Sequence, residues 1–271
     1  MKFLEMITYV ALLLAGLISC QDQIDWKLDA ETTDLLVVEG ILTNERTNHL
    51  IKLSRTNSKL NEGFTPAFGA TVLISDGENV IPLIELPFRS GHYYTTSVRA
   101  VIGKTYTLVI FHNGLQYAGQ DRAQPVEPLP ELSYRREADS LYTLNFEEGN
   151  DPSMTKHFMI WDHTEYCMKS DDICFAKLVY YDLKNIDVNQ MFKPDKVLVL
   201  FPENTVIVRK KYALSNGYRA FLRSVLSETE WRGGQFDVQR GNTLTNMSEG
   251  AIGFFAVSMV DSDTTLITPL P

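Results

Sequence analysis

The chain has 271 residues, of which 44% are hydrophobic, and it carries a formal net charge of -9 at pH 7. An acidic surface repels phosphate backbones and anionic lipid headgroups. The charge therefore argues against a nucleic-acid-binding protein and against a protein that lies flat on a membrane.

The N-terminus has the composition of an export signal. Lys2 precedes an uncharged, largely apolar run at residues 6–18. This run is too short for a membrane-spanning helix, which needs about 20 residues, but it has the length of a secretory signal. Residues 17–20, LISC, resemble a bacterial lipobox. We expect residues 1–19 to be removed and Cys20 to carry lipid as the anchor in the membrane; an ordinary signal peptide with an incidental Cys20 is the alternative.

Composition divides the rest of the chain into four segments. Residues 20–33 are polar and are expected to form a lipidated tether. Residues 34–122 are expected to form a β-sandwich domain, and residues 123–132 contain three prolines that favour an extended, semi-rigid linker. Residues 133–271 are expected to form a second, β-rich domain, because the length exceeds that of one typical domain.

The first domain shows regular strand signals. Seven short segments separated by turn residues have strand character: LLVVEGILT, LIKLSR, ATVLIS, VIPLIEL, GHYYTT, TYTLVIF and LQYAGQD. Asn113-Gly114 lies between two alternating runs, as a tight hairpin requires. In TYTLVIF, Tyr106, Leu108 and Ile110 share one face. The pattern predicts an immunoglobulin-like or transthyretin-like sandwich in a mainly β chain.

One amphipathic helix interrupts the strands of the second domain. Ser215 is a suitable N-cap for a helix near residues 216–230. Its apolar residues recur at helical spacing: Tyr218, Phe221, Leu222, Val225 and Leu226. The helix is expected to pack against a sheet, which makes this domain α+β.

Two cysteines remain if Cys20 carries lipid. In an exported protein, Cys167 and Cys174 are expected to form a disulfide that closes a short loop. The alternative is a zinc site that joins these thiols to His157 and His163, which would face the same side of an extended strand.

Catalytic and ligand-binding signals are weak. The sequence has no G-x-S-x-G, H-E-x-x-H or phosphate-loop motif, and no cofactor or metal site is predicted. His49, His92 and His112 lie in or beside expected turns and are expected to be solvated. Aromatic side chains offer a binding platform as an alternative to core packing: Tyr93-Tyr94, Tyr180-Tyr181 and Trp231.

Several segments together resemble a family of Bacteroidetes outer-membrane lipoproteins catalogued as domain of unknown function 4249. They are VVEGILTN, KLSRT, GATVLISD, GHYYTT and GKTYTLVI in the first domain, then YALSNGYRAFLRSV and GNTLTNMSEGAIGFFAVSMV. The resemblance implies an outer-membrane lipoprotein, often encoded beside a TonB-dependent transporter. It implies no catalytic residue. Because family members often have cysteines near Cys167 and Cys174, it also favours the disulfide.

Bacteroidetes export suggests two further features. Asp139-Ser140-Leu141 and Asp263-Thr264-Thr265 match the short pattern for O-glycosylation in this phylum, which makes Ser140 and Thr264 candidate acceptors. Asp22 and Asp25 follow Cys20 closely and favour the cell surface over the periplasmic face.

Three functions follow from these features. The first is a non-enzymatic accessory or binding subunit of a TonB-dependent β-barrel nutrient transporter. The second is a structural or adhesive envelope lipoprotein without a transport role. The third, a hydrolase, would require a cleft that gathers polar residues from distant segments.

Overall fold

A computed structural model describes the chain at residues 34–57, 63–138, 140–146, 149–168, 173–183, 198–229 and 243–269. The expected signal peptide at residues 1–19, the lipidated Cys20 and the tether that follows lie outside the described residues.

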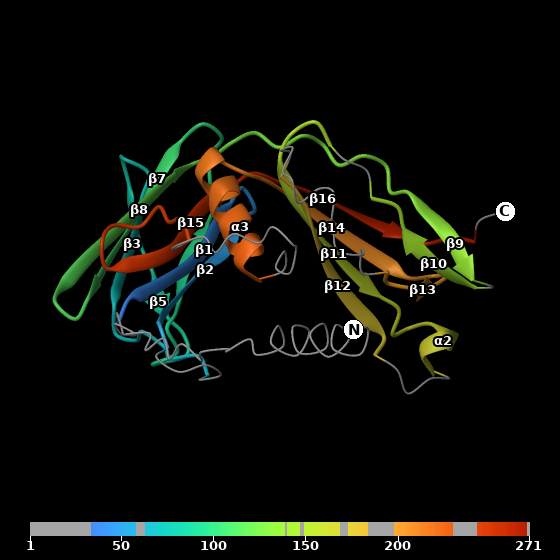
Figure 1. Cartoon of the computed structure of the whole chain (residues 1–271), viewed down its shortest axis with the longest axis horizontal. Helices are drawn as coiled ribbons and strands as arrows, with labels where there is room; N and C mark the ends of the chain where they lie inside the picture. Colours follow the sequence, from blue (N-terminus) through green and yellow to red (C-terminus); the bar gives the residue numbers. More distant parts are fainter. Residues whose placement is uncertain are drawn as a thin grey trace, which may run out of the picture. The chain divides into compact units, whose positions relative to one another are not determined.

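The described part is mainly β, as the sequence predicts (Figure 1). Sheet A contains five strands in the order β15 (Ala251–Ser258), β1 (Leu36–Thr43), β2 (Thr47–Arg55), β6 (His92–Val98) and β5 (Ile84–Glu85). Sheet B contains four strands in the order β4 (Val80–Pro82), β3 (Thr71–Ser75), β7 (Thr105–His112) and β8 (Leu115–Arg122). The two sheets share one hydrophobic core and form the expected sandwich.

The core of the sandwich contains the alternating apolar residues that the sequence predicts. In β7, Tyr106, Leu108 and Ile110 are all buried. Asn113 and Gly114 connect β7 to β8 with positive φ angles of 51° and 77°, as a tight hairpin turn with a matching twist requires. The expected hairpin is therefore confirmed.

Sheet A is completed by a strand from the C-terminal part of the chain. β15 lies parallel to β1, with Leu36 opposite Ala251 and Thr43 opposite Ser258 (Figure 1). Gly253 allows this close approach, because a Cβ atom there would collide with the Val38 carbonyl.

Two polar side chains join β15 to the edge of sheet B. The Asn246 amide donates to the carbonyls of Gln120 and Phe255, at 2.9 and 2.8 Å. The Asp121 carboxylate accepts a hydrogen bond from the backbone N–H of Val257 at 2.9 Å. Residues Asp34–Pro271 consequently form one compact unit, and the expected division at residues 123–132 does not separate the strands of the sandwich from the rest.

The remaining strands form two further sheets. Sheet C has the order β13 (Phe201–Pro202), β10 (Leu141–Leu144) and β9 (Tyr134–Ala138). Sheet D has the order β12 (Phe175–Asp182), β11 (Ser153–Ile160), β14 (Val206–Ala213) and β16 (Val260–Leu266). Tyr142 and Phe201 of sheet C share a hydrophobic cluster with Met159 and Ile207 of sheet D.

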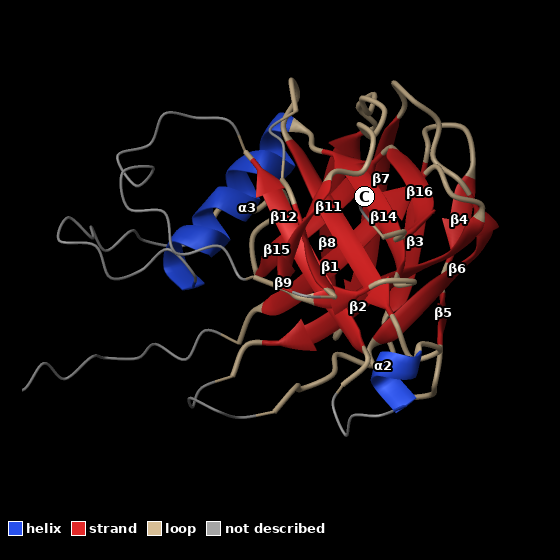
Figure 2. Ribbon diagram, turned by 90° about the vertical axis from the view of Figure 1, so that its right-hand side faces the viewer, coloured by secondary structure: helices blue, strands red, loops and turns tan. Residues whose placement is uncertain are grey.

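The main helix lies where the sequence predicts it. Helix α3 (Asn216–Thr229) begins after Ser215, whose Oγ accepts a hydrogen bond from the Tyr218 N–H at 3.1 Å. Tyr218 and Leu222 belong to a hydrophobic cluster that includes residues of β14 and β15. Figure 2 shows α3 and the short α2 (Glu165–Met168) outside the strands. Among the described residues, no helix is long and apolar enough to cross a membrane.

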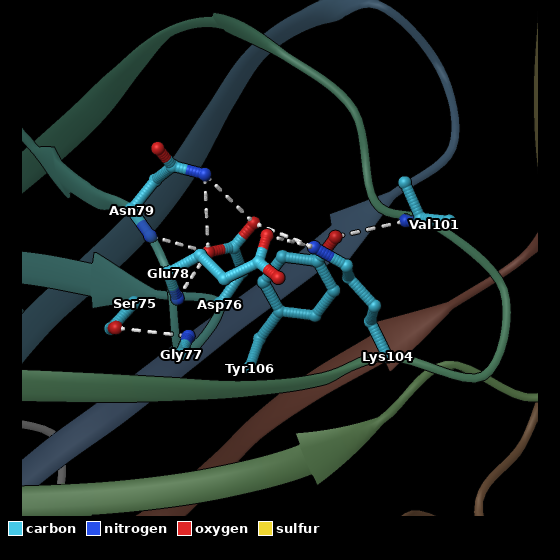
Figure 3. A network of polar contacts seen from close by, with 8 residues as sticks. All are labelled: Ser75, Asp76, Gly77, Glu78, Asn79, Val101, Lys104 and Tyr106. Atoms are coloured by element: carbon cyan, nitrogen blue, oxygen red, sulfur yellow. Dashed lines mark hydrogen bonds and ion pairs between the residues drawn. The ribbon is translucent and has the colours of Figure 1, made fainter.

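A polar network holds one end of the sandwich, at the turn between β3 and β4 (Figure 3). The Asp76 carboxylate accepts hydrogen bonds from the backbone N–H groups of Asn79 and Glu78, which hold the pKa of Asp76 well below its usual range. The Lys104 ammonium lies 3.2 Å from Asp76 and 3.3 Å from Glu78, and these contacts raise the pKa of Lys104. The network connects the β3–β4 turn to the start of β7.

Candidate functional site

One face of sheet D is polar over two adjacent rows. Residues opposite each other on neighbouring strands point to the same side of a sheet. The first row contains His157, Arg209 and Asp263 beside one apolar residue, Leu178, and the second is Tyr180, Thr155, Lys211 and Asp261. The side chains of His157, Arg209 and Lys211 are buried. We call this the polar face of sheet D.

Two chain segments cover the polar face and leave a cleft of about 260 Å³. Residues 127–133 form one wall, and Asn145, Phe146, Gly149 and Asn150 contribute another, while β11, β12 and β14 supply the floor. Phe146 and Tyr180 line the cleft with their rings stacked 5.1 Å apart. The cleft therefore combines an aromatic wall with ionisable groups.

Arg209 connects the floor of the cleft to its wall. The guanidinium donates from Nε to Asp263 Oδ1 at 2.8 Å, and from Nη2 both to Asp263 Oδ2 and, at 2.8 Å, to the Pro130 carbonyl. A bidentate pair of this kind fixes the plane of the guanidinium. A buried charge with a matched partner and a satisfied third donor is the arrangement that a protein interior tolerates.

His157 has a ring nitrogen without a hydrogen-bond partner among the described residues. This atom is Nδ1, and the side chain is 5% exposed. Burial, and to a lesser extent the nearby Arg209 charge, lower the pKa of His157 to about 4. The imidazole is therefore neutral at pH 7, with one ring nitrogen able to donate and the other able to accept.

Charged groups also meet at the Gly149 end of the cleft. Asp182 Oδ2 accepts the Gly149 N–H at 2.8 Å, and Glu127 Oε2 accepts the Asn150 N–H at 3.2 Å. The Lys211 ammonium lies 3.8 Å from Glu127 Oε2, a distance too long for a hydrogen bond. A Cβ atom at Gly149 would lie within 4 Å of all three charged groups, so the absence of a side chain keeps this end open.

The expected linker forms part of this site. Residues 123–132 are extended, as their prolines predict, but they pack against β15 and β16 instead of standing free between two bodies. Gln124 forms an isolated parallel β-bridge with Ser258, and the Leu129 N–H donates to Asp261 Oδ2 at 2.7 Å. The interpretation as a spacer is corrected because its backbone groups find partners in those strands.

Cys167 and Cys174 form the expected disulfide, with Cα atoms 5.8 Å apart. The bridge uses both thiols that the zinc alternative needs. His157 lies in the cleft, whereas His163 is exposed and bonds the Asn204 carbonyl at 2.9 Å. Over the described ranges, no group of three or more His, Cys, Asp or Glu side chains is placed to hold a metal ion.

Two histidines differ from the sequence prediction. His49 and His112 are buried, and burial lowers the pKa of both. The prediction of solvated side chains is wrong for these two because each ring bonds a distant carbonyl. His49 Nε2 contacts the Val98 carbonyl at 3.1 Å, and His112 Nε2 contacts the Phe68 carbonyl at 3.2 Å.

The remaining candidate residues are dispersed. Ser140 is exposed in the turn between β9 and β10, and Thr264 is exposed on β16, where it pairs with Val208. Both stay predicted glycosylation acceptors. Tyr93 is core, whereas Tyr180 lines the cleft; Trp231 lies outside the described residues.

A second surface feature lies on the sandwich. Four large apolar side chains are exposed on two adjoining loops, and Phe88 is the most exposed at 84%: Phe64, Phe68, Leu86 and Phe88. We call these four residues the aromatic loop surface. The Glu85 carboxylate joins the loops by accepting the N–H groups of Gly69 at 3.0 Å and Gly91 at 2.9 Å. The Arg89 guanidinium lies 4.1 Å from the centre of the Phe68 ring.

The first described residue is linked through two side chains to the backbone of Phe68. Asp34 is 3.6 Å from the Arg55 guanidinium, which donates to His112 Nδ1 at 3.4 Å. The other His112 nitrogen contacts the Phe68 carbonyl. These contacts connect Asp34, the first described residue, to the loop that contains Phe68.

Sequence reasoning missed the polar face and the aromatic loop surface. Alternation in TVIVRKKYAL does place Arg209 and Lys211 on one face, but charged residues on alternate positions usually indicate solvent. Their partners Asp263 and Glu127 come from distant segments, so no local signal identifies them.

Comparisons with known proteins identify a family. A comparison with curated proteins finds no match. Among solved structures, the chain is similar to the crystal structure of chicken CNTN1 FN1-FN3 domains, with 10% identity, a TM-score of 0.28 and coverage of 67% of this chain. The chain spans 62% of the length of that structure. The family model described as Domain of unknown function (DUF4249) matches residues 21–264. Because this match covers most of the sequence, the chain belongs to that family.

Proposed function

We propose that the protein is a Bacteroidetes outer-membrane lipoprotein that acts as a non-enzymatic accessory subunit of a TonB-dependent nutrient transporter. The lipobox-like residues 17–20 supply the proposed anchor, and lipid chains hold a protein durably at a membrane. Residues 21–33 provide the tether. The family resemblance of the sequence points to the transporter as the partner.

The observation that carries this proposal is the position of the aromatic loop surface. Contiguous exposed apolar side chains mark sites of interaction, and aromatic residues are enriched in the centres of protein interfaces. Phe68 is connected through His112 and Arg55 to Asp34, where the proposed tether would meet the folded unit. The proposed tether would keep the folded unit within reach of a transporter in the same membrane.

Confinement to the same membrane would strengthen a weak contact. Two proteins tethered in one plane meet at a raised effective concentration, so a small apolar surface suffices for docking. Phe88 is the best candidate for the central contact because most of its side chain is exposed.

Crosslinking in intact cells tests the docking. A photo-reactive amino acid at position 88 should capture an outer-membrane β-barrel, identified by mass spectrometry after pull-down. The same amino acid at position 102 is the matched control, since Ile102 is also an exposed apolar residue but lies in the turn between β6 and β7, at the opposite end of these strands from Phe68.

The anchor has its own test. Cys20→Ala should abolish fatty-acid labelling and membrane retention, and continued labelling would exclude Cys20 as the lipid site. Absence of any barrel enriched at position 88 over position 102 would overturn the accessory function and favour a structural or adhesive lipoprotein. Protease treatment of intact cells then reports whether the protein lies on the cell surface or the periplasmic face.

A further inference from the structure

The cleft over the polar face of sheet D has a size and a lining that can be compared with those of ligand sites. Its volume of about 260 Å³ is below the range typical of sites for drug-sized molecules, so it suits a single small ring or a short chain. Empty space of this size in a polar setting is filled either by several waters or by one ligand.

The charged groups that line the cleft are held by local partners. Arg209 is committed to Asp263 and the Pro130 carbonyl, so its charge is already matched. Asp182 accepts the Gly149 N–H, Glu127 accepts the Asn150 N–H and lies 3.8 Å from Lys211, and Glu131 is exposed to solvent. Three lining carboxylates then remain beside one ammonium, which disfavours an anionic ligand, and a neutral ligand adds no unmatched charge.

Two buried side chains in the cleft have incomplete polar contacts. His157 Nδ1 has no hydrogen-bond partner among the described residues. The Lys211 side chain is buried, and its ion pair with Glu127 is long, at 3.8 Å. An unsatisfied ring nitrogen and a long ion pair at an open cleft can both be completed by hydrogen bonds to a ligand.

Hydroxyl groups suit both contacts. A hydroxyl donates one hydrogen bond and accepts others, so it can pair with His157 Nδ1 in either tautomer. A second hydroxyl on the same ligand can accept from Lys211 and donate its one proton to the carboxylate of Asp182. A carboxylate or ammonium ligand would satisfy one of these groups and repel another of the same sign.

The aromatic wall adds a requirement for an apolar surface on the ligand. The stacked rings of Phe146 and Tyr180 line the cleft, and Phe146 also meets the His157 ring edge-on at 5.5 Å. A sugar ring offers hydroxyls on its edge and C–H groups on its face, and the C–H face packs by dispersion on an aromatic ring.

We propose that the cleft binds a neutral, hydroxyl-rich ring of monosaccharide size. His157 and Lys211 bond ligand hydroxyls, and the Phe146–Tyr180 wall packs on the ring face. This inference names the ligand class for the proposed transport function and rests on it for its biological role. The binding itself is tested on the isolated protein.

Titration calorimetry and ligand-observed NMR test the proposal with defined probes. The neutral probes are D-glucose, D-galactose and N-acetyl-D-glucosamine, and the charged probes are D-glucuronate and D-glucosamine. At least one neutral probe should bind saturably, and about tenfold more tightly than its charged analogue, a ratio typical of leaving one buried polar group mismatched.

Matched variants locate the binding. His157→Phe keeps a ring but removes both nitrogens, and His163→Phe makes the same change at an exposed histidine. Lys211→Met removes the ammonium in the cleft, whereas Lys210→Met removes one from the next residue, on the opposite face of the sheet. The two cleft variants should each weaken binding about tenfold, and the two controls should leave it unchanged.

The outcomes separate this proposal from the docking proposal. If no neutral probe binds, if charged probes bind better, or if neither cleft variant weakens binding, the sugar site is wrong and the cleft holds only water. Lys211→Met keeps the test valid if His157→Phe fails to fold, as circular dichroism would show. Crosslinking at position 88 requires no sugar, so either proposal can fail while the other stands.

Discussion

Strand alternation buries very different side chains in the sandwich and in sheet D. Between sheets A and B it buries fully enclosed apolar residues such as Leu36, Ile51 and Phe255. On the polar face of sheet D it buries Arg209 and Lys211. The first region gains stability from every residue it encloses, whereas the second is stable only while each charge keeps its partner. A buried face with such a requirement is the natural place for a ligand.

The largest loss of stability is expected from a large-to-small substitution in the apolar core between sheets A and B. Phe255→Ala should lower the free energy of unfolding by about 3–5 kcal/mol, because it removes a fully buried ring and leaves a cavity. Denaturant unfolding followed by circular dichroism measures this. An effect below about 1 kcal/mol would contradict the placement of β15 in this core.

The next largest loss of stability is expected from removing one charge on the polar face of sheet D. Arg209→Met should destabilise by about 2–3 kcal/mol, because Asp263 loses its partner in a partly buried position. Asp263→Leu combined with Arg209→Met should recover part of that loss, since no unpaired carboxylate remains. Additive losses in the double variant would show that the pair contributes no coupling.

Acid should destabilise the polar face of sheet D through His157. Because the folded pKa of His157, about 4, lies below its unfolded value, the unfolded state binds more protons between these two pKa values. Stability is therefore fully present above about pH 6.5 and falls as the pH drops toward 4, by at most about 1.4 kcal/mol per pH unit from this group.

His157→Gln should reduce the fall in stability with decreasing pH, compared with the protein that keeps His157. His49 and His112 also have lowered pKa values, so the difference between the two proteins isolates His157. The measurement is the denaturant midpoint from pH 4 to pH 7. Equal slopes in both proteins would show that His157 is not buried neutral.

The smallest effect is expected at the surface of the sandwich. Lys104→Met removes the ammonium that contacts Asp76 and Glu78, but the backbone N–H groups of Glu78 and Asn79 still hold the Asp76 carboxylate (Figure 3). We expect a smaller shift in thermal midpoint than for Arg209→Met, and it should shrink in high salt. A loss as large as that of Arg209→Met would contradict the contrast between buried and exposed charges.

The sequence predicted most of the sandwich because its signals are local. Alternating apolar residues in β7, the Asn113-Gly114 turn and the Ser215 cap each act within a few positions. The position of β15 could not be predicted in the same way. AIGFFAVSMV has the composition of a strand, but nothing in it specifies β1 as its neighbour.

The cleft could not be predicted for a related reason. Its floor combines β11, β12 and β14, and its wall is a proline-rich segment that has the composition of a linker. Local pattern can indicate that Arg209 and Lys211 share a face, but burial depends on what covers that face. The cover at residues 127–133 precedes these strands in the chain and becomes visible only in three dimensions.

The parallel pairing of β1 with β15 also has a consequence for the order of folding. Leu36 meets Ala251 across nearly the whole length of the chain, a contact of very high sequence separation, and such contacts form slowly because a long loop must close first. Sheet A lacks its outer strand, and its core lacks Phe255, until the C-terminal segment is synthesised. We therefore expect a growing chain to remain incompletely folded until late in its synthesis. A message truncated before codon 251 would yield a product recognised by proteases.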